Sequence, residues 1–307
     1  MYVLLNPESG GGRAIDRWQT VEADVRRRIG PFRLEVAAGS VVIRSCVQRA
    51  LDRGETDFVA AGGDGTVNAV ISAIAEHLPA PALRKVRVGA IGLGSSNDFH
   101  KPRGPEGTLR GIPVRLDFGG TVPSDLCSIE YLDALNRFGH CEWLINASLG
   151  TTAEANCRFN RPDSLMLWLK AHLPSAAIFY AAARAILWFR KSALDLRIGP
   201  EELRVRARNL GIVKQPNFSG SLRYGSEPTG PGKMDVHLIG DVGLSRLCLI
   251  AGRLLRGRFE GPGTRSWTVS RVSVTSDRTF LIERDGEVIR TRAAGFRVLP
   301  GAIQLCT

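Results

Sequence analysis

The chain has 307 residues, of which 44% are hydrophobic and 23% charged, and its formal net charge at pH 7 is +11. This composition is ordinary for a soluble globular protein, and no run of about eighteen apolar residues is present, which excludes a membrane-spanning helix. The basic excess favours a phosphate-bearing partner (a nucleotide, a nucleic acid or an anionic membrane face), but no nucleic-acid-binding motif is present.

The cysteines and the first residues indicate the compartment. The 6 cysteines are scattered, without a Cys-x-x-Cys pair or zinc-like spacing, so we expect reduced and buried thiols. The opening MYVLLNPESG lacks the basic and long apolar regions of a signal peptide. Both features favour a cytoplasmic location.

The first third of the chain alternates predicted strands with predicted helices. Short apolar strands are expected at 2–6, 57–63 and 85–94, a helix at 14–29, and a second helix where apolar residues recur between Val67 and Leu78. This alternation is typical of a parallel sheet covered by helices. Ligands of such sheets bind beyond the carboxyl ends of the strands, where three glycine-rich loops should gather.

The rest of the chain has a different pattern. Residues 113–120 read as a strand, 141–150 as a strand running into a loop, and 164–190 as two helices broken near Pro174. The remainder is mostly β, with a hairpin around the Arg-Asp-Gly of 284–286 and two short strands at the end. The predicted fold class is therefore α/β, with an N-terminal α/β domain built on a parallel sheet and a β-rich C-terminal domain.

The stretch GGDGT, residues 62–66, combines bare backbone with an acid at a helix start. Gly62, Gly63 and Gly65 would let backbone N–H groups approach an anion, and the Thr66 hydroxyl could cap the helix or contact a phosphate. Asp64 would repel a phosphate unless a cation lies between them, which favours Mg²⁺. The alternative is that Asp64 caps the following helix.

A second polar loop, GLGSSNDFH at 92–100, follows the third predicted strand. It brings Ser95, Ser96, Asn97 and Asp98 to the same sheet edge, although a capped helix start would have the same composition. Neither a Walker A loop nor G-x-G-x-x-G is present, so P-loop and Rossmann interpretations lose their main support.

The motifs NPESGGGR, GGDGTVN and GSSNDF, in this order, resemble the catalytic domain of the diacylglycerol kinase, sphingosine kinase and bacterial lipid kinase superfamily. The resemblance extends through VRLDFGG and LINASLGTTAEA to RDGEVI near the end. It implies a fold shared with NAD kinase, ATP and Mg²⁺ as cofactors, and a cleft between a nucleotide domain and a lipid domain.

The resemblance also implies roles for individual residues. Glu287 would be the general base for a lipid hydroxyl, although a Glu after a hairpin Asp-Gly is usually only solvated. Asp64, Asp98 and Asp117 would form an acidic cluster in the cleft, with Asp64 serving Mg²⁺. The ATP-binding residues would be Asn6, Ser9, Gly10, Gly62, Gly63, Asp64, Gly65, Thr66, Asn68, Ser95 and Asn97.

Two departures from the family pattern stand out. Where the family usually has an Asp that helps to hold a structural magnesium, GPGKMDV at 230–236 has Pro231, which offers neither a carboxylate nor an N–H. A magnesium site there is doubtful, and Asp235 does not replace that position. The loop GLGSSNDF also differs from the usual PxGTGNDF at Gly92 and Ser96, while Ser95 keeps a hydroxyl.

The apolar segment AAIFYAAARAILWF, residues 176–189, permits two interpretations. It is either a packed helix of the second domain or the lining of an acyl-chain site, where Trp188 and Arg190 would suit a membrane interface.

The sequence thus predicts an ATP- and Mg²⁺-dependent lipid kinase that associates peripherally with a membrane from the cytoplasm. Its nucleotide domain would span 1–118, with 296–307 returning to it, and its lipid domain 119–295. The alternatives are a kinase of a soluble acceptor, such as NAD or a polar alcohol, and an inactive nucleotide- or lipid-binding homologue. No nucleic-acid partner is expected, and the oligomeric state stays open, a homodimer included.

Overall fold

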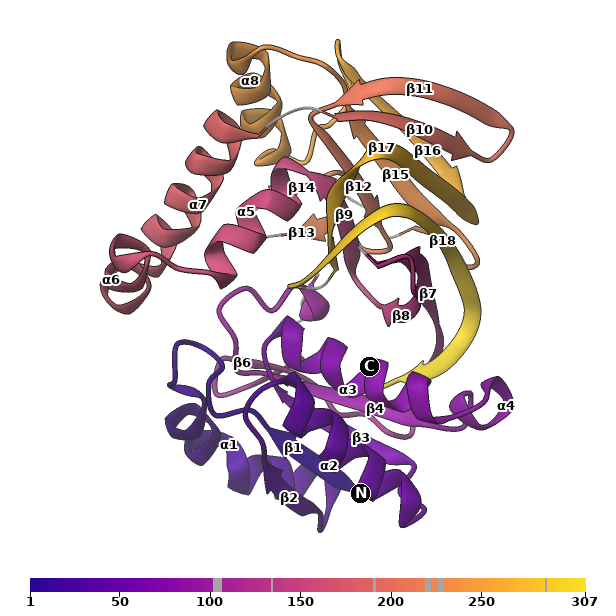
Figure 1. Ribbon diagram of the computed structural model, residues 1–307. Coiled ribbons are helices and arrows are strands. Elements are labelled where there is room, and N and C mark those ends of the chain that lie inside the picture. The colour runs from indigo at the N-terminus through magenta and orange to yellow at the C-terminus, as the bar shows by residue number, and fades with distance from the viewer. Residues whose placement is uncertain (102–106, 134, 190–191, 219–221, 226–228, 285) are drawn as a thin grey trace. The chain divides into compact units, whose positions relative to one another are not determined.

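The chain divides into two compact units in the computed structural model (Figure 1). The structure describes residues 1–307 except 102–106, 134, 190–191, 219–221, 226–228 and 285. The first unit comprises Met1–Leu126 with Leu299–Thr307, and the second comprises Cys127–Val298. The division thus falls after residues 126 and 298, whereas the sequence placed it after 118 and 295.

Two strands carry the chain from one unit to the other. They are β7 (Val122–Leu132) and β18 (Glu287–Leu305). The end of β18 pairs in parallel with the first unit's β4, Gln304 opposite Arg87 and Leu305 opposite Val88. The predicted two short terminal strands are therefore wrong in detail, because one continuous strand runs from the hairpin to Leu305.

The first unit is built on a parallel sheet in the order β2-β1-β3-β4. Its strands are β1 (Tyr2–Leu5), β2 (Arg33–Val36), β3 (Asp57–Gly62) and β4 (Arg87–Gly92). The burial of β1, β3 and most of β4 is expected of parallel strands covered on both faces. Beyond β4 lie the short β5 (Thr108–Leu109) and β6 (Ile112–Arg115), and β6 runs antiparallel to β4.

Helices cover both faces of this sheet. α1 (Ala14–Ile29) buries Trp18, Val21 and Val25 against one face, at the spacing of a single apolar stripe. On the other face α3 (Asp64–His77) packs against β3 and against α2 (Ser40–Asp52), and the short α4 (Ala80–Leu83) follows it (Figure 1). The sequence predicted α1 and α3 but missed β2 and α2.

The described residues of the second unit form a mostly antiparallel β structure with four helices. Its helices are α5 (Thr151–Asn160), α6 (Ser164–His172), α7 (Pro174–Trp188) and α8 (Leu244–Leu254). Besides β7 and β18 its strands are β8 (Phe138–Trp143), β9 (Asn146–Gly150), β10 (Ser192–Ile198), β11 (Glu201–Ala207), β12 (Asn209–Val213), β13 (Asn217–Phe218), β14 (Leu222–Arg223), β15 (Met234–Ile239), β16 (Thr264–Val269) and β17 (Arg271–Arg284).

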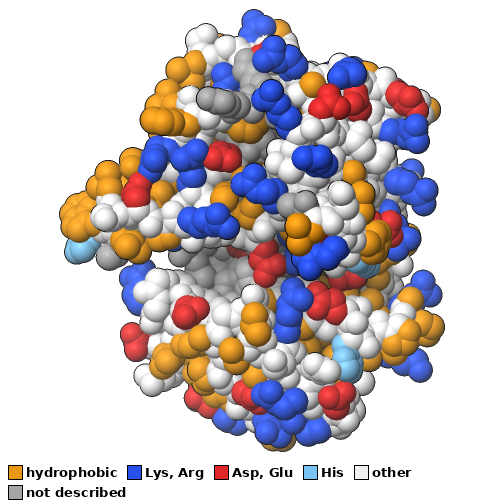
Figure 2. Space-filling model, in the orientation of Figure 1, with side chains coloured by type: hydrophobic (Ala, Val, Ile, Leu, Met, Phe, Trp, Pro, Cys, Tyr) orange, Lys and Arg blue, Asp and Glu red, His pale blue; other side chains and the backbone are white. Residues whose placement is uncertain are grey.

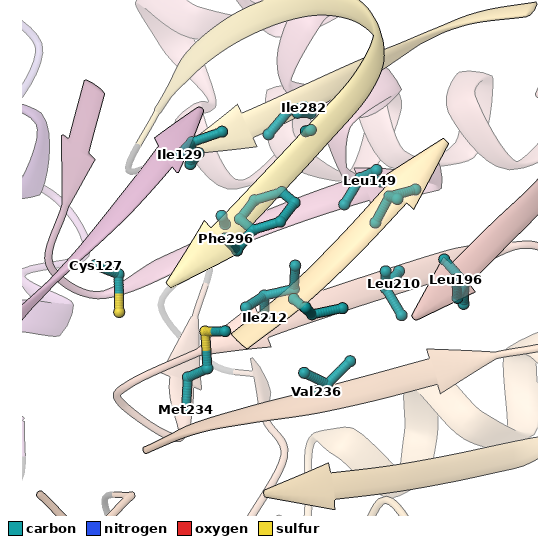
Figure 3. Packing of buried hydrophobic residues seen from close by; sticks show 14 of the residues in the cluster. Cys127, Ile129, Leu149, Leu196, Leu210, Ile212, Met234, Val236, Ile282 and Phe296 are labelled. Carbon is teal, nitrogen blue, oxygen red and sulfur yellow. The ribbon is translucent and has the colours of Figure 1, made fainter. Parts of the chain in front are cut away.

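Side chains from these strands meet in one apolar core (Figure 3). Phe296 of β18 lies in this core, with no exposed surface, among residues of β7, β9, β12, β15 and β17. The core contacts labelled in Figure 3 are Cys127, Ile129, Leu149, Leu196, Leu210, Ile212, Met234, Val236 and Ile282. Each comes from a strand whose alternate residues point inward, which is why the sequence pattern predicted a β-rich domain.

Several local predictions for this unit need correction. Residues 141–150 form parts of two strands, and the helix α5 follows them where a loop was expected. α8 lies in a region predicted to be mostly β, because its apolar stripe of Leu247, Ile250 and Leu254 has helical spacing. The six cysteines are all outside disulfides, as predicted, but Cys248 is exposed and Cys157 half-buried rather than buried.

The predicted break between two helices at Pro174 is confirmed, since α6 ends at His172 and α7 begins at Pro174. Proline is tolerated there because the first helical residue needs no hydrogen-bonded N–H. Among the helices of the described residues, none is both long and apolar enough to cross a bilayer.

Candidate nucleotide-binding site

Three glycine-rich loops of the first unit meet beyond the carboxyl ends of β1, β3 and β4, as the sequence predicted. In the strand order β2-β1-β3-β4, β2 is added on one side of β1, whereas β3 and then β4 are added on the other. The switch in direction lies between β1 and β3, which is the position where open α/β sheets bind ligands. The loop after β1 reaches the loop after β3 through three contacts. Asn6 Nδ2 donates to Thr66 Oγ1 at 3.0 Å, the hydroxyls of Ser9 and Thr66 lie 3.3 Å apart, and the Gly63 N–H donates to Ser9 Oγ at 3.2 Å.

Close backbone approach joins these loops to the one after β4. A Cβ at Gly94 would lie 2.4 Å from the Cα of Gly63, and a Cβ at Gly10 would lie 2.5 Å from the Leu93 carbonyl oxygen. Real Cβ atoms do not approach backbone so closely, so only glycine fits at both positions. The glycines of these motifs therefore serve first to let the three loops touch.

The loop after β4 is stabilised from inside and from outside. Asn97 has a left-handed backbone (φ 49°), and its buried amide bonds the Gly94 N–H and the carbonyls of Gly92 and Gly94 at 3.0–3.1 Å. The Arg17 guanidinium of α1 donates to the carbonyls of Gly92, Leu93 and Gly94 at 2.8–3.3 Å. Sequence analysis missed Arg17, because an arginine on a helix surface carries no motif.

Asp64 is the first residue of α3, but it does not cap that helix. The N-cap is Gly63, without a side-chain bond, and Asp64 Oδ1 instead accepts the Phe99 N–H across the loops at 2.9 Å. The helix-capping alternative is therefore wrong. Burial raises the pKa of Asp64, and the charge of the nearby Asp98 raises it further. The backbone N–H groups of Phe99 and Asp98 and the charge of Lys101 lower the pKa, but by less.

Asp98 and Lys101 complete this acidic corner. Asp98 begins the short 3-10 helix η1 (Asp98–His100), is buried, and accepts a hydrogen bond from Lys101 Nζ at 2.6 Å. Lys101 partly balances two carboxylates that would otherwise repel each other. The sequence did not single out Lys101, which follows the GSSNDF motif by two residues.

Asp117 does not join Asp64 and Asp98. β6 runs antiparallel to β4 with Arg115 opposite Ala90, so the chain after β6 returns toward the start of β4. There Asp117 is exposed and accepts the N–H groups of Gly119 and Gly120 at 3.0 Å, while Arg87 of β4 bonds the Phe118 carbonyl. The resemblance implied a three-carboxylate cluster, and the structure brings two of the three together.

The remaining residues of the predicted ATP site differ in accessibility. Ser95, in the loop after β4, and Gly65, in the first turn of α3, are exposed, so a ligand can reach them. Thr66, Asn68 and Gly62 are buried: the Thr66 hydroxyl joins the loops instead of capping α3, and Asn68 accepts the Ser72 hydroxyl at 3.5 Å. The exposed positions suit contact with a phosphate, and the buried ones hold the loops in place.

The donor set at Asp64 fits a Mg²⁺ ion that takes its other ligands from phosphate and water. Asp64 is only partly buried, and its carboxylate lies at the N-terminus of α3, where the unbonded first N–H groups favour anions. Within the described part of the chain, no group of three or more Asp, Glu, His or Cys side chains could hold a metal ion. Mg²⁺ needs no such group, because it commonly binds through one or two carboxylates plus substrate phosphates.

Glu287 lies in the second unit at the predicted hairpin, where Arg284 pairs with Glu287 across the turn. Arg284 is buried, and its Nη2 donates to Glu287 Oε2 at 2.6 Å. The buried Glu283 accepts the Gly286 N–H and the Ser148 hydroxyl, and Asn160 of α5 donates to the Gly286 carbonyl. These contacts fix the turn and leave the Glu287 side chain 37% exposed, so its carboxylate is both oriented and accessible. Asp285 lies outside the described residues.

A pocket of about 240 Å³ lies within the second unit. Its walls include the apolar side chains of Leu149, Trp188 and Phe280, together with the opposite charges of Glu154 and Arg290. The pocket is therefore mixed in character, with apolar side chains that could contact a hydrocarbon group and charged ones that could bind a polar group.

Comparison with known proteins agrees with this geometry. Residues 1–128 match the model of the diacylglycerol kinase catalytic domain. The match covers the N-terminal part of the chain, which is less than half of its 307 residues. The match contains the three loops and also Asp117, so the resemblance noted in the sequence is confirmed.

Two curated relatives align with a short part of the chain. A diacylglycerol kinase of Staphylococcus carnosus (strain TM300) is 36% identical over 90 residues, and a probable lipid kinase YegS-like of Serratia proteamaculans (strain 568) is 38% identical over 88 residues. Each alignment covers 27% of this chain and 27% of the relative.

Solved structures share the fold over nearly the whole chain. The crystal structure of a diacylglycerol kinase from Bacillus anthracis str. Sterne has a TM-score of 0.66 at 12% identity and covers 99% of this chain and 95% of that one. Another structure from that organism reaches a TM-score of 0.73 at 13% identity, covering 99% and 96%. The predicted fold class, an α/β domain with a parallel sheet followed by a β-rich domain, is confirmed.

The raised pKa of Asp64 predicts that the ionised carboxylate lowers the stability of the first unit near neutral pH. Because the pKa of Asp64 in the folded state lies above its ordinary value of 3.8, the protonated carboxyl favours the folded state. This contribution to stability is fully present below pH 3.8 and is lost as the pH rises through the raised pKa. Asp64→Asn should therefore unfold at a higher temperature than the wild type near neutral pH, and the difference should close as the pH falls toward 3.8. Thermal unfolding followed by circular dichroism across this pH range measures it.

Asp163→Asn provides a control of opposite sign. The Met166 N–H and the Arg184 guanidinium lower the pKa of Asp163, so this substitution should destabilise the protein near neutral pH. An Asp64→Asn variant less stable than the wild type at neutral pH would contradict the electrostatic account of Asp64.

Proposed function

We propose that this protein is an ATP-dependent lipid kinase, which transfers the γ-phosphate of ATP to the hydroxyl of a diacylglycerol-like or related lipid. The observation that carries the proposal is the position of Asp64. It lies at the N-terminus of α3 and reaches across to the loop after β4, within a domain of the diacylglycerol kinase family. A carboxylate held there is explained by a cation shared with phosphates, and not by helix capping.

In this proposal the three loops of the first unit bind the phosphates of ATP. The N–H groups at the start of α3, with the exposed Gly65 and Ser95, would donate to phosphate oxygens. When bound, Mg²⁺ supplies the positive charge that offsets the negative charge of the triphosphate, with Asp64 as its protein ligand. Arg17 and Asn97 keep the loop after β4 in position and so act through it.

Glu287 is proposed as the general base. The lipid hydroxyl oxygen would form a bond to the γ-phosphorus while the bond from that phosphorus to the bridging oxygen of ADP breaks, and the hydroxyl proton would pass to Glu287. Positive charge and well-placed donors supply most of the catalysis of such a transfer, and a positioned base adds about a hundredfold or more. Arg284 would orient the carboxylate through its 2.6 Å contact.

A lipid acceptor is supported by the second unit. The pocket beside Trp188 and Phe280 offers these apolar side chains to a hydrocarbon group, and Glu154 and Arg290 to the polar part of a lipid. The segment 176–189 was interpreted either as a packed helix or as the lining of an acyl-chain site, and it has features of both. Its helix α7 buries Ala177, Ala181 and Ala185 but exposes Phe179 and Trp188. Arg190, which the sequence also suggested for a membrane interface, lies outside the described residues.

Membrane association is proposed for the exposed side of α6 and α7. Figure 2 shows apolar side chains gathered at the α6 end of this helical pair, on the left of the view. The residues with large apolar exposed side chains are Leu165, Leu167, Trp168, Leu173, Ile178, Phe179, Leu187 and Trp188. An apolar surface with aromatic side chains on a protein of net charge +11 suits an anionic bilayer surface, to which the enzyme would bind peripherally from the cytoplasm.

Lipid kinase activity is tested with labelled ATP, Mg²⁺ and mixed micelles of diacylglycerol, sphingosine, ceramide and a total bacterial lipid extract. The wild type should label a lipid, Asp64→Ala should abolish labelling, and Glu287→Gln should lower kcat by about a hundredfold or more. Glu201→Gln, an exposed carboxylate of the same unit that pairs with Arg265, is the matched control and should keep wild-type activity.

The alternatives predict other outcomes of the same assay. Label on NAD or a polar alcohol, with indifference to micelles, would favour a kinase of a soluble acceptor. ATP binding without any labelled product would favour an inactive homologue. The main argument for that alternative is Pro231, which stands where the family usually has an Asp. Either result would overturn the lipid kinase proposal.

Vesicle binding tests the proposed membrane surface. The double variant Phe179→Ser, Trp188→Ser should bind anionic phospholipid vesicles at least about tenfold more weakly than the wild type, because burying one large apolar side chain contributes roughly 1.5 to 3 kcal/mol. Phe138→Ser, which removes an equally exposed aromatic side chain from β8, should bind like the wild type. Equal binding by all three proteins in a sedimentation assay would exclude this surface.

A further inference from the structure

The ammonium group of Lys214 lies among backbone carbonyl oxygens in the second unit. Lys214 directly follows β12 and is only 7% exposed. Its Nζ donates to the carbonyls of Lys233 at 2.7 Å, Gly230 at 3.1 Å and Thr229 at 3.4 Å. Three oxygens of one short turn therefore face a single positive charge.

The turn formed by residues 229–233 closes around this charge. The Thr229 N–H donates to the Lys214 carbonyl, and the Lys233 N–H donates to the Gly230 carbonyl, both at 3.3 Å. The Thr229 hydroxyl donates to Asp235 Oδ2 at 2.6 Å, and the Thr268 hydroxyl donates to Asp235 Oδ1 at 2.6 Å. Both oxygens of the nearby carboxylate thus accept hydrogen bonds from hydroxyl groups, and Lys214 binds the carbonyls of the turn.

Converging carbonyl oxygens are the ligands that hard cations prefer. The resemblance to lipid kinases implies a structural magnesium at this turn, with an Asp at the position of Pro231. The donor set here does not fit that ion. Pro231 has no carboxylate, and the Lys214 ammonium already places a positive charge against the carbonyls, so a divalent cation would be repelled.

We propose that the Lys214 ammonium is a built-in cation of the turn at 229–233 and stabilises it in place of a bound divalent metal. The Lys214 ammonium gives up water on folding because the side chain is only 7% exposed, and the three carbonyl oxygens replace that water. A lysine directly after the strand β12 supplies both the charge and the donors, and it cannot be removed by a chelator. This role is independent of any kinase activity.

The first test measures the wild type alone, without nucleotide. Its unfolding temperature should be the same in EDTA and in millimolar Mg²⁺ or Mn²⁺, and equilibrium dialysis against Mn²⁺ should show no stoichiometric metal bound. A fall in unfolding temperature with EDTA that Mg²⁺ reverses, or one tightly bound Mn²⁺ per chain, found also in Asp64→Ala, would overturn the proposal, because the turn would then take a metal despite Lys214. Neither readout requires an active enzyme.

The second test removes the charge. Lys214→Met keeps most of the aliphatic stem and should lower the unfolding temperature by roughly 5 °C or more, because three hydrogen bonds from a charged donor are lost. Lys233→Met is the matched control, since the exposed Lys233 contributes its carbonyl and not its ammonium to the turn, and it should unfold like the wild type. Equal unfolding temperatures for all three proteins would contradict the proposal.

Discussion

The close approach of the Gly63 and Gly94 backbones is the constraint on which the candidate site depends. Two loops from adjacent parallel strands can touch there only because neither residue has a side chain. The contact brings the start of α3 against the loop after β4, so the Asp64 carboxylate reaches the Phe99 N–H. The loop after β1 then joins through Thr66, and three segments distant in the sequence become one surface.

The electrostatics of this surface carry a cost in stability. Asp64 and Asp98 are close enough for each charge to oppose the other, and Lys101 offsets only part of that repulsion. A protein selected for stability alone would have little reason to keep Asp64 partly buried beside Asp98. A carboxylate kept at such a cost, at a helix N-terminus beyond a parallel sheet, is typical of a functional site. The turn at 229–233 differs, because its group of like partial charges is neutralised: the Lys214 ammonium donates hydrogen bonds directly to the carbonyl oxygens.

Patterns of residue type predicted most of the architecture and part of the site. The strand–helix alternation located β1, α1, β3, α3 and β4, because each has a clear apolar period. The strand β2 was missed because it is only four residues long, its burial does not alternate and none of its residues is fully buried. Arg17 could not have been predicted, since its contacts with the loop after β4 depend on packing between segments about 75 residues apart in sequence.

Motifs identified residues more reliably than they identified contacts. Asp117 matches a family motif, yet the antiparallel direction of β6 carries it away from Asp64. Thr66 was expected to cap a helix or bind phosphate. Its hydroxyl does not cap α3 but joins two loops, a contact that required the position of Asn6 to be known, and its contact with phosphate stays a prediction. The roles of Glu287 and of the ATP-contacting residues stay predictions, because they concern a ligand and a reaction.

The central claim is that contact between the glycine loops forms the phosphate site, and nucleotide binding measured by titration calorimetry tests it most directly. The wild type should bind ATP in the presence of Mg²⁺, and Gly94→Ala should bind it roughly tenfold or more weakly, because its Cβ would force the loops apart. Gly295→Ala, in a strand of the second unit with open space around its Cβ, should bind like the wild type. Equal affinity for Gly94→Ala and the wild type, or no binding by the wild type, would contradict the account.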